Sequence, residues 1–228
     1  ISLLRLRLSI QLTAVQHCSS LKDAADTSRT FYLLALAFYH IGSYAEAIDI
    51  VNNQLDHNPK WTAMGGRLYT LLMCCYFRSK NMSKNLKAAI IAFDAAKAIF
   101  SYILGPNHPV HALLMSTLAD QYSHIAAFPQ AALAQTAAVE ISQRVMVDHA
   151  HVLTAAYEFK LAQIQMLMMD VGDGDRSDDI SVKTSMAHAD LALESLTNSM
   201  STYESLRSDG VGVALEIIQC LYALTQLS

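Results

Sequence analysis

Three alanines recur at a constant interval and constrain the fold of this 228-residue chain more than any other feature. Ala47, Ala89 and Ala131 stand 42 residues apart (89 − 47 = 42 and 131 − 89 = 42), and each opens a stretch that predicts the second helix of a helix–turn–helix unit. A period of about 20 to 50 residues is typical of repeat proteins, whose units cannot bury their apolar faces alone and stack on one another. The spacing therefore predicts an all-α chain of antiparallel helix pairs.

The clearest unit shows how such a pair is encoded. Phe31 and Phe38 lie on one face of its first helix, because residues three, four and seven apart share a helix face. Gly42 predicts the turn, and the small side chain of Ala47 lets the second helix approach the first closely. Pro59 follows the second helix, whose end it predicts because the residue before a proline avoids the α region.

Two segments resemble known families. The stretch FYLLALAFYHIGSYAEAIDIVNNQLDHNP, which starts at Phe31, looks like a tetratricopeptide repeat (TPR), except at Gln54, where a small residue is usual. The junction LGPNHP at 104–109 is similar to the link between the longer repeats of kinesin light chains, and similar links occur in the helical C-terminal domain of SET and MYND methyltransferases. The resemblance implies a TPR-like α-solenoid of about four to five repeats.

The junction also has a physical meaning. Gly105 can adopt the left-handed conformation that ends a helix, Asn107 or His108 can cap the next helix, and Pro109 suits its first turn. The same register recurs 43 residues later, where HVLTAAYEFKLAQ from His151 follows HPVHALLMSTLAD from His108. In the third unit Ala126 replaces the glycine that the family has at the turn, which weakens the resemblance there.

These landmarks predict one repeat domain over residues 1–228. We expect repeat 1 at 28–60, repeat 2 at 61–106 with a longer turn RSKNMSKNLK, repeat 3 at 107–148, repeat 4 at 149–207, and the first helix of a fifth repeat at 208–228. An uncovered first helix and an N-terminal isoleucine predict a fragment of a longer chain. The opening LLRLRLSIQL fits a strand or a helix, and we favour a helix because a lone strand has no sheet to join.

The fourth repeat contains an insertion. Leu161 and Ala162 fit its first helix, and Ala189, Leu193 and Leu196 fit its second helix. The interval of 58 residues between Ala131 and Ala189 (189 − 131 = 58) exceeds the period by 16. The extra residues fall in an Asp-, Gly- and Ser-rich stretch, which predicts a surface loop at 170–180.

Composition excludes several classes of function. The chain is 53% hydrophobic and 16% charged, yet no apolar run reaches the roughly 20 residues that span a bilayer, so we expect no membrane insertion. A net charge of −4 gives no broad attraction for nucleic acid. The four cysteines have no metal-ligand spacing and indicate a reducing, intracellular compartment. We expect a cytoplasmic protein that can associate with the cytoskeleton.

Two constellations could bind metal, and each has a simpler explanation. Four histidines near the junctions could converge on zinc, namely His108, His111, His149 and His151. No Cys or carboxylate completes the set of ligands, and helix capping explains the positions of these histidines. Four oxygen-bearing residues alternate as in a calcium loop, namely Asp173, Asp175, Ser177 and Asp179. Asp178 stands where that loop needs glycine, and Thr184 where it needs glutamate, which favours a solvated loop.

No catalytic motif is present in the sequence, so we expect neither an enzyme nor a cofactor. A helical-repeat array binds protein partners instead, and first helices line its concave wall. Counting from the packing positions, the wall consists of Tyr32, Leu36, Tyr39, His40, Thr70, Cys74, Phe77, Arg78, Ser116, Asp120, Ser123, His124, Phe159, Gln163, Met166 and Leu167. This mixed aromatic and polar surface suits an extended peptide or a partner helix.

Three hypotheses about function remain. The first is an adaptor or scaffold that binds a peptide or helix in this groove. The second is an architectural segment of a large assembly, cytoskeletal or other, in which neighbours cover both faces. The third and weakest is the helical C-terminal part of a SET/MYND-type methyltransferase, whose catalytic domain would lie outside these residues.

Overall fold

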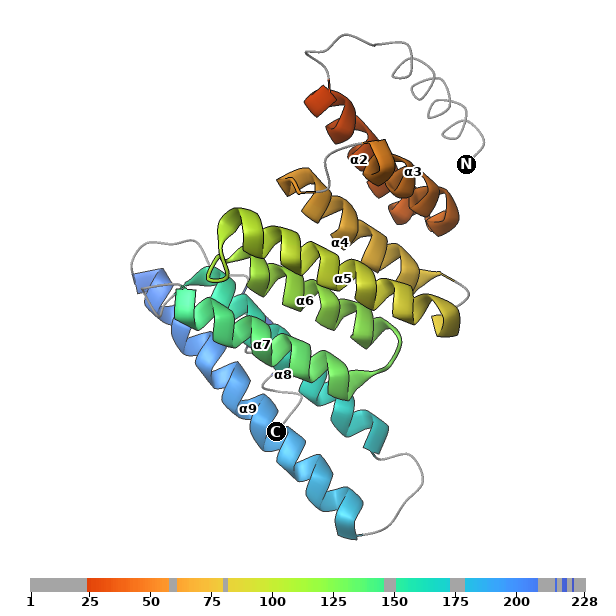
Figure 1. Cartoon of the computed structure of the whole chain (residues 1–228). Helices are drawn as coiled ribbons and strands as arrows, with labels where there is room; N and C mark the ends of the chain where they lie inside the picture. The colour runs from red at the N-terminus through yellow and green to blue at the C-terminus, as the bar shows by residue number, and fades with distance from the viewer. Residues whose placement is uncertain are drawn as a thin grey trace. The chain divides into compact units, whose positions relative to one another are not determined.

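The computed structural model describes residues 24–57, 61–79, 82–145, 151–172 and 179–208, together with Glu216, Gln219, Cys220 and Ala223. Every regular element in these residues is an α-helix (Figure 1). The helices are α2 (Ala24–Ile41), α3 (Tyr44–His57), α4 (Ala63–Arg78), α5 (Met82–Leu104), α6 (Val110–His124), α7 (Phe128–Val145), α8 (Val152–Gly172) and α9 (Asp179–Ser208). The chain divides into two compact units, unit 1 (Ile1–Ile103) and unit 2 (Leu104–Ser228).

In unit 1, α2 packs against α3, and α4 packs against both. Gly42 ends α2 with φ +83°, a left-handed conformation that costs glycine little. Its N–H donates to the Tyr39 carbonyl at 3.0 Å, and the Ser43 N–H donates to the Phe38 carbonyl at 2.9 Å. This tight turn reverses the chain, so α2 and α3 form the predicted antiparallel pair.

The second pair of unit 1 depends on close approach. Gly66 of α4 lies against the Phe100 ring of α5, where a Cβ atom would stand 2.5 Å from Cε1. Helix α5 begins at Met82, earlier than the predicted turn RSKNMSKNLK allows. Lys and Leu are good helix formers, and the Asn85 amide donates to the Ser79 hydroxyl, which ties the helix to the end of α4.

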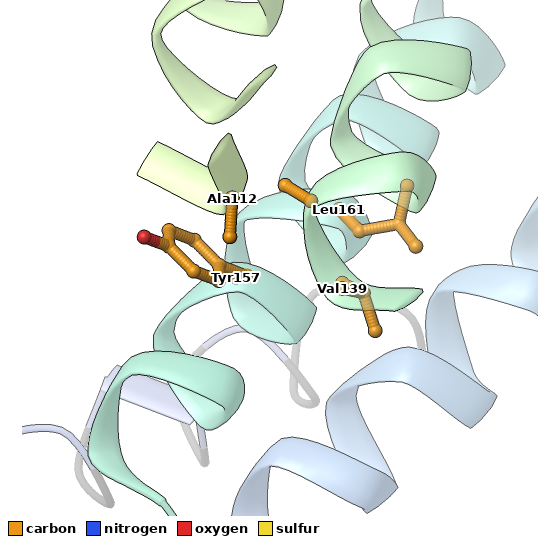
Figure 2. Close-up of a cluster of buried hydrophobic side chains, with 5 residues drawn as sticks. Ala112, Val139, Tyr157 and Leu161 are labelled. Carbon is orange, nitrogen blue, oxygen red and sulfur yellow. The ribbon is translucent and has the colours of Figure 1, made fainter. Parts of the chain in front are cut away.

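In unit 2, α6 packs on α7, α7 on α8, and α8 on α9. Figure 2 shows side chains of three helices meeting in one cluster: Ala112 of α6, Val139 of α7, and Tyr157 and Leu161 of α8. All four are buried, and each fully buried aliphatic or aromatic side chain stabilises the fold by roughly 1.5–3 kcal/mol. The predicted all-α fold of antiparallel helix pairs is confirmed in both units.

The predicted contact alanines are buried. Ala47, Ala89 and Ala131 each have 0% exposure. The first helices bury an apolar pair at the same place in each repeat. These pairs are Leu34 and Ala35, Leu72 and Met73, Leu118 and Ala119, and the predicted Leu161 and Ala162.

Of the three positions predicted to pack in α9, Leu196 is buried at 0% exposure as expected, but the other two are not buried. Leu193 is 48% exposed and Ala189 is only half-buried, whereas Ala192 has 0% exposure. The buried residues 192, 196, 199 and 203 repeat the spacing of 131, 135, 138 and 142 in α7. The interval is therefore 61 residues (192 − 131 = 61). The error arose because alanine and leucine alternate in LALESL at 191–196, so that two helix faces have similar apolar content.

The junction before each first helix in unit 2 has the predicted caps. Gly105 has φ +84°. The Val110 N–H donates to His108 Nδ1 at 3.2 Å, and the Leu153 N–H donates to His151 Nδ1 at 3.1 Å. Two histidines 43 residues apart thus make the same hydrogen bond, which confirms that they cap helices.

Several expectations fall partly or wholly outside the described residues. The N-terminal segment LLRLRLSIQL and His149 lie outside them, as do the side chains of the calcium-like loop. The predicted loop at 170–180 is shorter than expected, because α8 continues to Gly172 and α9 begins at Asp179. For the fifth repeat, Glu216, Gln219, Cys220 and Ala223 are helical, and Cys220 and Ala223 are buried against residues of α8 and α9.

Candidate functional site

Helices α2 and α4 present a shared surface in unit 1. We call it the unit-1 first-helix face, and it consists of Arg29, Tyr32, Leu36, Tyr39 and His40 of α2 with Arg67, Thr70 and Arg78 of α4. Steps of three and four residues place each set along one side of its helix. The side chains of this face are partly or fully exposed.

The two tyrosines of this face lie beside cations. Partial burial raises the pKa of the Tyr32 hydroxyl, and the Arg67 guanidinium opposes that rise. Burial likewise raises the pKa of Tyr39, Cys74 adds to the rise, and Arg78 opposes it. Each tyrosine of α2 is therefore close enough to an arginine of α4 for their charges to interact.

The charge of the face has a single sign. The charged side chains of this face are the cations Arg29, Arg67 and Arg78, and the side chain of Asp26 in α2 lies outside the described residues. The Tyr39 ring also stands edge-on to His40 and Tyr44, at centroid distances of 5.4 Å and 5.7 Å. The face thus combines aromatic rings with positive charge.

Two residues predicted for the wall of unit 1 belong to the core. Phe77 is 1% exposed and Cys74 is 7% exposed, because both point between the helices. Burial also raises the pKa of the neighbouring Cys75 thiol to about 12, which keeps it protonated and unreactive. Neither Phe77 nor Cys74 offers an exposed side chain to a partner in this structure.

In unit 2, an ion pair joins the first helices α6 and α8. Lys160 Nζ lies 2.6 Å from Asp120 Oδ1, and it donates to the Ser116 hydroxyl at 3.0 Å and to the Ser116 carbonyl at 3.4 Å. Ser116 is buried at 3% exposure. Ser116 and Asp120, two of the residues predicted for the wall, thus both interact with Lys160.

The other predicted residues of unit 2 are divided between surface and core. Phe159 and Met166 pack against the buried clusters that α8 forms with α9 and Ala223. Ser123 is half-buried, whereas Gln163, His124 and Leu167 are exposed. For the accessible members of both units, binding of a partner stays a prediction.

Buried polar side chains connect α7 to α8. The Gln135 amide donates to the Tyr157 carbonyl at 2.8 Å, and the Gln143 amide donates to Glu158 Oε1 at 3.1 Å. Glu158 is 7% exposed, and its Oε2 has no hydrogen-bond partner among the described residues. Burial raises the pKa of this carboxyl group, and the hydrogen bond from Gln143 opposes the rise.

Within the described ranges, no group of three or more His, Cys, Asp or Glu side chains is placed to hold a metal ion. His111 Nε2 lies 3.0 Å from the Gly105 carbonyl, where it supports the helix junction. The described helices also include none that is both long enough and apolar enough to cross a membrane.

Three side chains of these surfaces were not predicted from the sequence, namely Arg29, Arg67 and Lys160. Arg67 lies one turn before Thr70 on the same stripe of α4, so extending the predicted wall by one turn would have included it. Lys160 occupies a position one turn before the predicted Gln163, and only the packing of α6 against α8 brings it to Asp120.

The pairing of successive antiparallel helices through buried small residues decides the type of fold. The chain has an all-α helical-repeat fold. The chain is similar to a solved structure of a putative kinesin light chain with nearly identical TPR-like repeats from Podosopora anserina, with 15% identity and a TM-score of 0.48 over 87% of this chain and 93% of that one. No protein-family model matches the chain, and no curated protein matches it.

Proposed function

We propose that the chain is a non-catalytic protein-interaction module that binds an extended peptide or a helix of a partner on the unit-1 first-helix face. The observation that carries the proposal is that two helices which pack against each other carry accessible tyrosines and arginines, Tyr32 and Tyr39 on α2 and Arg67 and Arg78 on α4. Tyrosine and arginine dominate the binding energy of many protein interfaces, since both offer a large contact area with polar groups at its end.

The charge of the face supports a partner segment with Asp or Glu side chains. Arginine forms two parallel hydrogen bonds with a carboxylate, and such charge-assisted bonds are roughly twice as strong as neutral ones. The charged residues of the face are Arg29, Arg67 and Arg78, so it attracts an acidic peptide and repels a basic one.

The cysteines support an intracellular, cytoplasmic location for this module. Cys74, Cys75 and Cys220 are buried and form no disulfide bond among the described residues. A reducing compartment preserves such thiols, and a cytoplasmic adaptor or scaffold role is consistent with them.

A specific observation supports the second candidate function, an architectural segment of a larger assembly. Large apolar side chains are exposed, including Ile91 at 69% and Leu133 at 74%, and Trp61 and Tyr102 stand edge-on with ring centroids 5.3 Å apart while 59% and 76% exposed. Exposed apolar clusters commonly mark contacts with other proteins.

The proposed binding is tested with labelled peptides in fluorescence anisotropy. One peptide alternates Glu with apolar residues, and its control carries Gln in place of Glu. We expect the wild-type chain to prefer the acidic peptide, and Arg67→Glu to weaken that binding by about tenfold or more. Lys87→Glu makes the same change in charge at an exposed site of α5 and serves as the matched control.

Tyr32→Ala extends the test to the aromatic part of the face. It should weaken the acidic peptide by about tenfold while the circular dichroism and the melting temperature stay unchanged. Equal binding of the two peptides, or equal loss with Arg67→Glu and Lys87→Glu, would show that this face is not the binding surface.

A further inference from the structure

Helix α9 carries an exposed face of mixed acidic and apolar character. We call it the α9 outer face, and it consists of Met186, Asp190, Leu191, Leu193 and Glu194. Its apolar side chains are well exposed: Met186 at 63%, Leu191 at 47% and Leu193 at 48%. Between residues 186 and 205, α9 contains the acids Asp190, Glu194 and Glu204 and no lysine or arginine.

The two carboxylates of this face are placed unfavourably in the isolated helix. Asp190 and Glu194 are one turn apart, and like charges at this spacing destabilise a helix. Among the described side chains, no cation forms an ion pair with either of them. A cationic partner surface would therefore remove a repulsion as well as add an attraction.

The unit-1 first-helix face has the complementary character. Arg29 and Arg67 are exposed. Among the side chains that the structure describes, no carboxylate forms an ion pair with either arginine. Tyr32 and Tyr39 of the same face have half-buried rings, which can cover leucine or methionine side chains of a partner. One face thus offers acids among aliphatic residues, and the other offers arginines among aromatic residues.

We propose that the α9 outer face of one copy of this chain binds the unit-1 first-helix face of a second copy. This inference rests on the proposed function, because it names a segment of the chain itself as the acidic partner helix. The two faces are different surfaces, so the contact is head-to-tail, and each bound copy leaves one face of each kind open for further copies. Association therefore grows with concentration, and it weakens with salt because it depends on exposed charges.

Sedimentation velocity of the full chain at low and high ionic strength tests the inference. We expect the average mass at low salt to rise with protein concentration and to return to the monomer value at high salt. Arg67→Glu alone and Glu194→Lys alone should each weaken association by about tenfold or more, since each makes an attraction repulsive. Mixing the two variants should restore pairing, because the intact α9 outer face of Arg67→Glu meets the intact unit-1 first-helix face of Glu194→Lys, while each variant alone lacks one of the two faces.

Matched controls exclude a general effect of charge. Lys87→Glu and Glu140→Lys reverse charges at exposed positions of α5 and α7 and should leave the association constant within about twofold of the wild-type value. A wild-type chain that stays monomeric at every concentration in low salt would overturn the inference. So would charge reversals at Arg67 and Glu194 that act no more strongly than these controls.

The same variants separate this inference from the proposed function. Glu194→Lys leaves the unit-1 first-helix face intact and should bind the acidic peptide at least as tightly as the wild-type chain. If Glu194→Lys binds that peptide but the wild-type chain never self-associates, the proposed function stands and the second copy is excluded as its partner. If no acidic peptide binds, the proposed function fails on its own evidence.

Discussion

Ala126 holds the backbone conformation that Gly42 holds 84 residues earlier in the chain (126 − 42 = 84). Its φ is +57°, against +83° at Gly42. The hydrogen bonds match as well, because Ala126 N–H donates to the Ser123 carbonyl at 3.0 Å and Ala127 N–H donates to the Tyr122 carbonyl at 2.9 Å. The turn at Ala126 thus has the left-handed backbone conformation that favours glycine, although the residue there is alanine.

The first prediction follows from this turn. For most residues with a side chain, the left-handed region costs roughly 1–2 kcal/mol. Ala126→Gly removes this cost but also gives the unfolded chain more conformational freedom. We therefore expect a net stabilisation of about 1 kcal/mol. Gly42→Ala should destabilise it by a similar amount. Urea denaturation measures both, and Ala127→Gly, at a position of ordinary φ, should give no gain.

Gly66 provides the second prediction. Gly66→Ala places a methyl group 2.5 Å from Cε1 and 2.7 Å from Cζ of Phe100, so α4 and α5 must move apart. We expect a loss of roughly 1–3 kcal/mol in the free energy of unfolding. Phe100→Leu shortens the facing side chain, and the double variant should lose less than the sum of the two single variants. Additive losses would show that the two residues do not meet.

The third prediction tests the repeat register at Ala131, which has 0% exposure. Ala131→Leu should overpack the contact between helices and destabilise the chain by roughly 1–3 kcal/mol. Thr136→Leu adds bulk at an exposed position of the same helix and should change stability by less than about 0.5 kcal/mol. Thermal denaturation compares the two, and an unchanged melting temperature for Ala131→Leu would contradict the register.

The fourth prediction concerns pH and Glu158. Burial raises the pKa of this carboxyl group above its value of 4.5 in the unfolded chain. Between these two pKa values the folded chain binds more protons than the unfolded chain, so stability falls as the pH rises through that window and stays lower above it. Glu158→Gln removes the buried charge and should raise the melting temperature at pH 7.

The gain from Glu158→Gln should shrink as the pH falls below the unfolded pKa, where the wild-type carboxyl group is already neutral. Glu140→Gln makes the same change at an exposed site of α7 and should leave the melting temperature almost unchanged. A gain of the same size at every pH would mean that the titration of Glu158 is not its cause.

The local sequence determined the helices and most of their pairing. Small residues at Ala47, Ala89 and Ala131 and the capping pattern at His108 and His151 are local signals, because the conformation of a helix end and the face of a helix depend on residues within a few turns. These positions were predictable without knowledge of their neighbours in space. Where two registers had similar apolar content, as in α9, local pattern could not choose between Ala189 and Ala192.

Only the tertiary structure decided which polar and aromatic side chains remain available to a partner. Phe77 and Tyr39 occupy similar positions in the counted pattern, yet Phe77 is buried by helices that pack around it and Tyr39 is half-exposed beside an arginine. Lys160 meets Asp120 across 40 residues of sequence (160 − 120 = 40), a contact that helix packing creates. Exposure and ion pairing depend on residues far apart in the chain, and a periodic pattern describes only the side of a helix on which a residue lies.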